Sequence, residues 1–203
     1  MTELSSGIVM FLFNFIILRL EGNTGVAAFG VITVISLVVV AIYTGLSQGI
    51  QPIISANYGT GNRAEVKTIL RYAMATVLLL SGVIYMVIFF GASQIALIFN
   101  SERNETLQTL AVTGLKLYFL ACPFIGFNIV TATYFTSTER PHPAQIISFL
   151  RGLFVLVPVA FLLSAILRMT GVWLAYPISE CIVAMVGAAF YFLNKKKSFE
   201  GSL

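Results

Sequence analysis

Residues 45–61 read GLSQGIQPIISANYGTG and close a long apolar run that starts near residue 26. Gly45 and Gly49 stand four residues apart, which lets a second backbone approach closely. Pro52 removes a backbone donor and can kink a helix, and Gln48 and Gln51 would be costly against lipid. The stretch predicts a helix end with a glycine-rich turn, or a polar element that faces protein or a watery cavity.

The composition identifies an integral membrane protein. Of the 203 residues, 58% are hydrophobic and 10% are charged, and the mean hydropathy is +0.94. Soluble domains carry about 25% charged residues, so this chain has too few to cover a water-facing surface. The net charge of +4 comes from loop and tail lysines and arginines, and no nucleic-acid motif accompanies it. With one histidine and no aspartate, the chain is expected to hold neither a metal site nor a cofactor.

The hydropathy pattern predicts an all-α integral membrane protein, a bundle of six transmembrane helices. Each span needs about 20 apolar residues. The candidates are residues 4–20, 26–56, 72–90, 115–134, 144–167 and 172–193. The second would reach roughly 46 Å, longer than the hydrocarbon core, so it must tilt, project from the membrane or break near residues 45–52. Residues 1–193 are then one bundle and residues 194–203 a basic tail.

A basic stripe precedes the third span. Asn62 reads as an N-cap with Glu65 at the third helical position. Arg63, Lys67 and Arg71 follow at four-residue spacing, which predicts a short interfacial helix. The stripe could contact anionic lipid or serve only as a cytoplasmic anchor. The loops and tail on this side carry more basic residues than the opposite side, so we place both termini in the cytoplasm.

Two charged residues lie inside predicted spans. Glu180 lies about 12 Å into the sixth span and Arg151 about 12 Å into the fifth, from opposite ends. Adjacent antiparallel spans would hold them about one helical turn apart in depth, so we expect an ion pair or a shared polar network. A separation beyond roughly 8 Å would reject direct pairing. Tyr176 shares the face of Glu180, which could instead bind a cation or take up a proton.

Further polar residues could line a pathway. Glu3, Gly7, Met10 and Asn14 share one face of the first span. Asn14 and Asn128 face either a cavity or a neighbouring helix. No nucleophile–base pair, phosphate loop or carboxylate dyad is present, so an enzyme is not expected.

Several short segments, taken in order, resemble the C-terminal half of multidrug and toxic compound extrusion (MATE) transporters, in the MepA-type bacterial branch. The helix-end motif of Gly49, Gln51, Pro52, Asn57, Tyr58 and Gly59 is similar to the end of the second helix of each half. Other matching segments are residues 3–9 with Asn14, Phe127–Asn128 with Tyr134–Phe135, Arg151–Gly152, and Gly171–Trp173 with Pro177 and Ser179–Glu180.

The resemblance implies half of a twelve-helix antiporter in the bacterial plasma membrane. Such transporters exchange H⁺ or Na⁺ for cationic, often aromatic drugs by alternating access. The partner would be an N-terminal six-helix half, which this chain lacks. The expected substrate or ion pathway comprises Glu3, Asn14, Gln48, Gln51, Asn128, Arg151, Tyr176 and Glu180. Because the chain has no aspartate, coupling to sodium is less favoured than coupling to protons.

Two alternatives remain open. A related flippase for lipid-linked sugars would line its cavity with several basic groups, whereas Arg151 is nearly alone. A six-helix structural subunit would instead associate through Gly45 and Gly49.

Overall fold

The computed structural model describes the backbone of residues 2–200 and the side chains of residues 7–193. Its helices are α1 (Thr2–Gly59), α2 (Arg63–Phe99), α3 (Glu105–Tyr118), α4 (Cys122–Ser137), α5 (Pro141–Phe149) and α6 (Leu156–Glu200). A 3₁₀ turn, η1 (Phe119–Ala121), joins α3 to α4, and a π-helical turn, η2 (Leu150–Phe154), joins α5 to α6. No strand occurs within residues 2–200.

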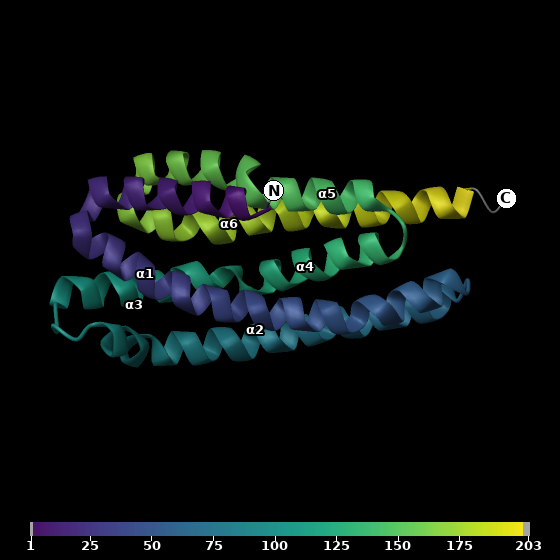
Figure 1. The fold of residues 1–203 in the computed structure, drawn as a ribbon, viewed down its shortest axis with the longest axis horizontal. Helices are drawn as coiled ribbons and strands as arrows, with labels where there is room; N and C mark the ends of the chain where they lie inside the picture. The colour runs from purple at the N-terminus through teal and green to yellow at the C-terminus, as the bar shows by residue number, and fades with distance from the viewer. Residues whose placement is uncertain (1, 201–203) are drawn as a thin grey trace.

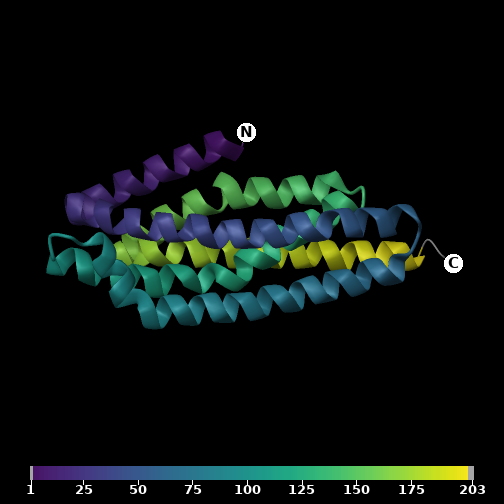
Figure 2. The ribbon, with the colours of Figure 1, turned by 60° about the horizontal axis from the view of Figure 1, so that its bottom comes forward.

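The described chain makes six passes, as the hydropathy pattern predicts. Four continuous helical stretches are long and apolar enough to cross a membrane. Two of them reverse direction internally, at Gly22 (φ 64°, ψ −156°) and at Arg168 (φ 53°, ψ −129°) (Figure 1). Gly171 permits the second reversal, because a Cβ there would lie 2.0 Å from the carbonyl oxygen of Leu163. In Figure 2 the N-terminal pass of α1 diverges from the rest of the bundle.

The second pass continues unbroken through the polar stretch. The helix keeps its geometry past Pro52 and ends at Gly59. Of the three outcomes considered for this long span, a break near residues 45–52 therefore does not occur. A Cβ at Gly45 or Gly49 would meet nothing within 4 Å, so neither glycine serves a close approach among the described residues.

The third pass corrects one expectation. The N-cap is confirmed, since the Asn62 side chain accepts a hydrogen bond from the Glu65 amide at 3.3 Å. The separate interfacial helix is wrong, because α2 runs without interruption from Arg63 to Phe99. No glycine or proline occurs in residues 63–81, so nothing stops the helix near Arg71.

Prolines distort the fourth and fifth passes. The η1 turn lies just before Pro123 in the fourth pass. The η2 turn lies just before Pro158, whose ring cannot donate to the carbonyl of Phe154 and would clash with it. The Val155 amide instead donates to the carbonyl of Leu150, at 3.2 Å. The π turn thus fits the chain around the proline, and Arg151 lies inside it.

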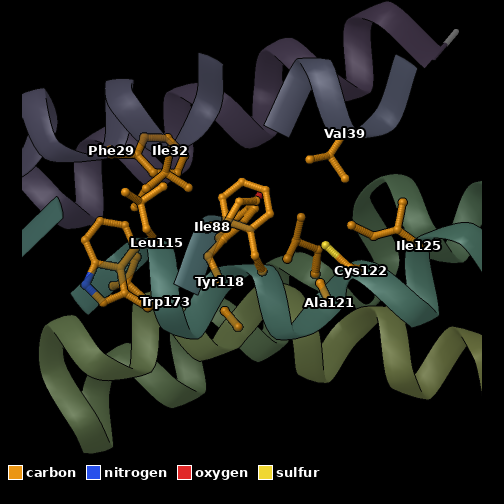
Figure 3. Close-up of a cluster of buried hydrophobic side chains, with 14 of the residues drawn as sticks. Phe29, Ile32, Val39, Ile88, Leu115, Tyr118, Ala121, Cys122, Ile125 and Trp173 are labelled. Atoms are coloured by element: carbon orange, nitrogen blue, oxygen red, sulfur yellow. The ribbon is translucent and has the colours of Figure 1, made fainter. Parts of the chain in front are cut away.

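A buried aromatic core joins three of the helices. Trp173 is 1% exposed and stacks on Phe29 at 6.3 Å between ring centroids. Figure 3 shows Tyr118, Leu115 and Ile32 beside them, where α1, α3 and α6 meet. The last pass extends further than expected, since α6 is helical to Glu200 rather than ending at residue 193.

Candidate functional site

The Arg151–Glu180 ion pair is confirmed. Arg151 Nε donates to both carboxylate oxygens of Glu180, at 2.7 Å and 3.0 Å. Glu180 is 2% exposed, whereas the side chain of Arg151 is 23% exposed. The π turn positions the arginine and α6 positions the carboxylate. It is the one ion pair found among the described side chains, so the deepest charges in the bundle neutralise each other.

Asn128 completes the site from α4. Its Nδ2 donates to Glu180 Oε2 at 2.7 Å and to the Glu180 carbonyl oxygen at 2.9 Å. Its Oδ1 is buried and has no hydrogen-bond partner among the described residues. The carboxylate therefore holds α4, η2 and α6 together, and a change in its charge would act on all three elements.

Two tyrosines form an aromatic wall next to the pair. The rings of Tyr118 and Tyr176 stack with centroids 4.5 Å apart and an interplanar angle of 4°. Tyr176 precedes Glu180 by four residues on α6, so the ring and the carboxylate lie on the same helix face. The wall offers a flat surface on which an aromatic molecule could stack.

These residues line a cavity of about 900 Å³. Its walls come from both passes of α1 and from α3, α4, α5, η2 and α6. They include Met10, Ser36, Tyr118, Asn128, Arg151, Tyr176 and Glu180. Among the lining residues, Arg151 is the sole lysine or arginine and Glu180 the sole acid. A largely apolar cavity with a few convergent polar groups is the usual form of a small-molecule site.

Other expected pathway residues lie elsewhere. Asn14 is half-buried and does not line the cavity. Gln48 and Gln51 are exposed on the surface of α1, so within this bundle they face neither protein nor cavity. The side chain of Glu3 lies outside the described residues.

The last three residues of the helix-end motif, Asn57 to Gly59, end α1 and lead into the turn before α2. The Asn62 amide donates to the carbonyl oxygen of Asn57 at 2.9 Å, and Gly61 takes a φ of 78°. The guanidinium of Arg63 lies 3.4 Å from the ring centroid of Tyr58. Asn57 and Tyr58 therefore stabilise the turn between α1 and α2.

Sequence reasoning missed three residues that shape the site. Tyr118 was not singled out, although its position five residues before Pro123 placed it beside a distorted turn. Ser47 and Thr133 were also missed, and their hydroxyls hydrogen-bond to each other between α1 and α4. Ser47 lies within the quoted stretch, one residue before Gln48, and it is Ser47 rather than the glutamines that turns inward.

The fold and the hydropathy define the class of a multi-pass membrane protein. The chain belongs to the MatE family, whose model matches residues 1–162. It is 27% identical over 176 residues to a FAD transporter of Shewanella oneidensis, covering 86% of this chain and 37% of that protein. It is 24% identical to the multidrug export protein MepA of Staphylococcus saprophyticus, covering 87% of this chain and 38% of that protein.

Solved structures share the fold. The chain matches an inward-facing MATE multidrug resistance transporter with a TM-score of 0.92 and 21% identity, over 100% of this chain and 47% of that one. A transporter of the wider MOP superfamily from Pyrococcus furiosus, described as having a binding pocket of reversed polarity, gives a TM-score of 0.87 and 22% identity. That match covers 95% of this chain and 43% of the other. The chain thus spans less than half the length of these relatives.

Proposed function

We propose that this chain forms the C-terminal six-helix half of an ion-coupled multidrug efflux antiporter. An N-terminal half would complete the cavity, and cationic or aromatic compounds would leave the cell by alternating access. Family membership, six passes and a match to under half of each relative support this arrangement. We place it in the bacterial plasma membrane with both termini in the cytoplasm, as the charge bias of the loops favours.

The buried ion pair in the wall of an apolar cavity carries the proposal. Neutral aliphatic side chains could pack the same space without the cost of desolvating two charges. Intramembrane carboxylates instead often mark ion and proton pathways. The Arg151–Glu180 pair fits that role, because it is both buried and adjacent to the cavity.

Coupling would work through competition for the Glu180 carboxylate. A proton or a sodium ion that binds this carboxylate weakens its attraction to Arg151 Nε and to Asn128 Nδ2. The π turn that holds Arg151 can then separate from α6, because its hydrogen-bonding is already irregular. The ion shifts the equilibrium between two arrangements only to the extent that it binds one of them better.

Arg151 makes a second substrate class worth testing. Both of its hydrogen bonds to Glu180 use Nε, and its side chain is 23% exposed where it lines the cavity. Guanidinium groups bind carboxylates and phosphates, and the stacked tyrosines suit an aromatic ring. An anionic aromatic substrate, such as the FAD named for the Shewanella relative, is therefore the second candidate.

The flippase alternative has less support. A pyrophosphate carrier needs several basic groups, and Arg151 is the sole one among the cavity-lining residues.

The test is transport by the full-length protein in proteoliposomes under an imposed proton or sodium gradient. We expect ethidium efflux in the wild type and loss of ion-driven efflux in Glu180→Gln. Glu102→Gln and Gln94→Ala, both exposed away from the cavity, are the matched controls. Normal coupled efflux in Glu180→Gln would contradict the proposal. FAD transport without ethidium transport would select the second substrate class.

A further inference from the structure

A second cavity lies on another face of the bundle. It has a volume of about 590 Å³ and is lined by α2, α4 and α6, with no residue in common with the first. Lys67 and Arg71 of α2 stand at this cavity, while Phe127, Tyr191 and Phe192 supply apolar walls. The second cavity therefore combines two cations with a surface suited to a hydrocarbon chain.

Neither cation has a counter-charge among the side chains that the structure describes. No acidic residue lines the cavity, and neither cation forms an ion pair with a described side chain. Glu65 is two residues from Lys67 on α2 and so does not share its face. Arg63 is held over the ring of Tyr58, whereas Arg71 has only the ring of Tyr72 at 5.7 Å. The charge of Lys67 and Arg71 is thus available to an anion.

A buried hydroxyl points to the same conclusion. Thr131 lines the cavity and is 3% exposed, yet its Oγ1 has no hydrogen-bond partner among the described residues. A buried polar group normally finds a partner, and leaving it unpaired costs about 1–3 kcal/mol. The Oγ1 is covered in this structure, so the side chain must rotate toward the cavity before an acceptor such as an ester carbonyl can satisfy it.

The depth of the cavity also fits a lipid. Leu78 and Leu79, on the exposed side of α2, begin about 10 Å beyond Arg71 along the helix. Tyr72, an aromatic residue of the kind enriched at membrane interfaces, is exposed next to Arg71. The cations therefore lie where the membrane-facing surface changes from charged to apolar.

We propose that the second cavity binds one anionic phospholipid. Lys67 and Arg71 contact the phosphate, the Thr131 hydroxyl donates to an ester carbonyl, and an acyl chain lies along Phe127, Tyr191 and Phe192. The site is independent of the transport cavity, so it stands whether or not this chain takes part in drug efflux.

The test is native mass spectrometry of the full-length protein in detergent with an equimolar mixture of phosphatidylglycerol and phosphatidylcholine. The wild type is expected to retain phosphatidylglycerol preferentially. Lys67→Gln with Arg71→Gln should lower that retention about fivefold for each cation removed. Arg19→Gln with Arg103→Gln makes the same charge change at other exposed positions and should leave retention unchanged.

Two further arms make the result decisive. Thr131→Val removes the hydroxyl while keeping all charges, and should also weaken retention of phosphatidylglycerol. Soluble glycerol phosphate at the lipid concentration should not displace the lipid, because it lacks the acyl chain. Equal retention by the Lys67/Arg71 variant and by the control would overturn the proposal. Equal binding of glycerol phosphate would overturn it too, since the ligand would then be a soluble phosphate.

Discussion

The two cavities differ in whether their charged side chains are paired, although α4 contributes to both. On one side Asn128 helps to hold a carboxylate that an arginine already neutralises. On the other side Thr131, one turn away, is unbonded and the nearby cations have no acidic neighbour in the cavity lining. A compensated charge inside the bundle can respond to a competing ion, whereas an uncompensated one at the rim attracts a permanent anion. We therefore expect the first cavity to rearrange when an ion binds, and the second cavity to keep its ligand.

The largest expected effect comes from breaking the compensated pair. Glu180→Ala leaves Arg151 without its counter-charge in a low-dielectric region and should cost about 3–5 kcal/mol of unfolding free energy. Chemical unfolding of the full-length protein in detergent measures it, with Glu102→Ala as the exposed control. Replacing both Arg151 and Glu180 by Met should recover most of the loss. A single-variant loss below about 1 kcal/mol would show that the pair is dispensable for stability.

The next effect tests α4 as the shared wall. A Cβ at Gly126 would lie 2.6 Å from Val77 Cγ1 and 2.8 Å from Tyr43 Cε1. Gly126→Ala should therefore destabilise by about 1–3 kcal/mol through overpacking. Gly82→Ala is the matched control, because a Cβ there meets nothing within 4 Å and alanine favours the helix. Equal melting temperatures of the two variants would mean that α4 can shift away from its neighbours.

A smaller effect compares the two α4 side chains that line different cavities, Asn128 and Thr131. Asn128→Ala removes two hydrogen bonds to Glu180 and should cost about 1–3 kcal/mol. Thr131→Val removes a hydroxyl with no described partner, so in phosphatidylcholine alone it should be neutral or slightly stabilising. Thermal unfolding in nanodiscs of defined lipid measures both. A similar loss of stability in both variants would contradict the account, because it would mean that the Thr131 hydroxyl also has a partner within the bundle.

The smallest effect is expected in the polar stretch of α1. Gln51 is exposed, so Gln51→Ala should change the unfolding free energy by no more than about 0.5 kcal/mol. If the exposed face of α1 meets the N-terminal half, the same variant should still slow efflux. Unchanged stability together with unchanged efflux would remove Gln51 from the pathway.

Local patterns predicted much of this architecture. The six passes, the chain reversals after the first and fifth spans, and the Asn62 cap all follow from hydropathy and capping chemistry within a few residues. The Arg151–Glu180 pair followed from depth alone, because two charges in adjacent spans have few other partners.

The remaining features depend on which helix faces meet. Gln51 and Ser47 are both polar residues of the same stretch, yet only Ser47 turns inward, toward Thr133. That outcome is set by the rotation of α1 against α4, which hydropathy does not encode. The π turn at Arg151 was likewise out of reach, because Pro158 signals a distortion without specifying its form. The second cavity needs three helices that are distant in sequence, so only the basic stripe hinted at it.

The most direct test of the account measures how ions affect substrate binding by the purified full-length protein. Fluorescence anisotropy of ethidium would be followed at pH 6 and pH 8, with and without sodium, in the wild type and in Glu180→Gln. The account predicts that protons or sodium weaken ethidium binding in the wild type and that Glu180→Gln binds equally under all four conditions. An unchanged ion dependence in Glu180→Gln would contradict it, because the coupling ion would then bind elsewhere.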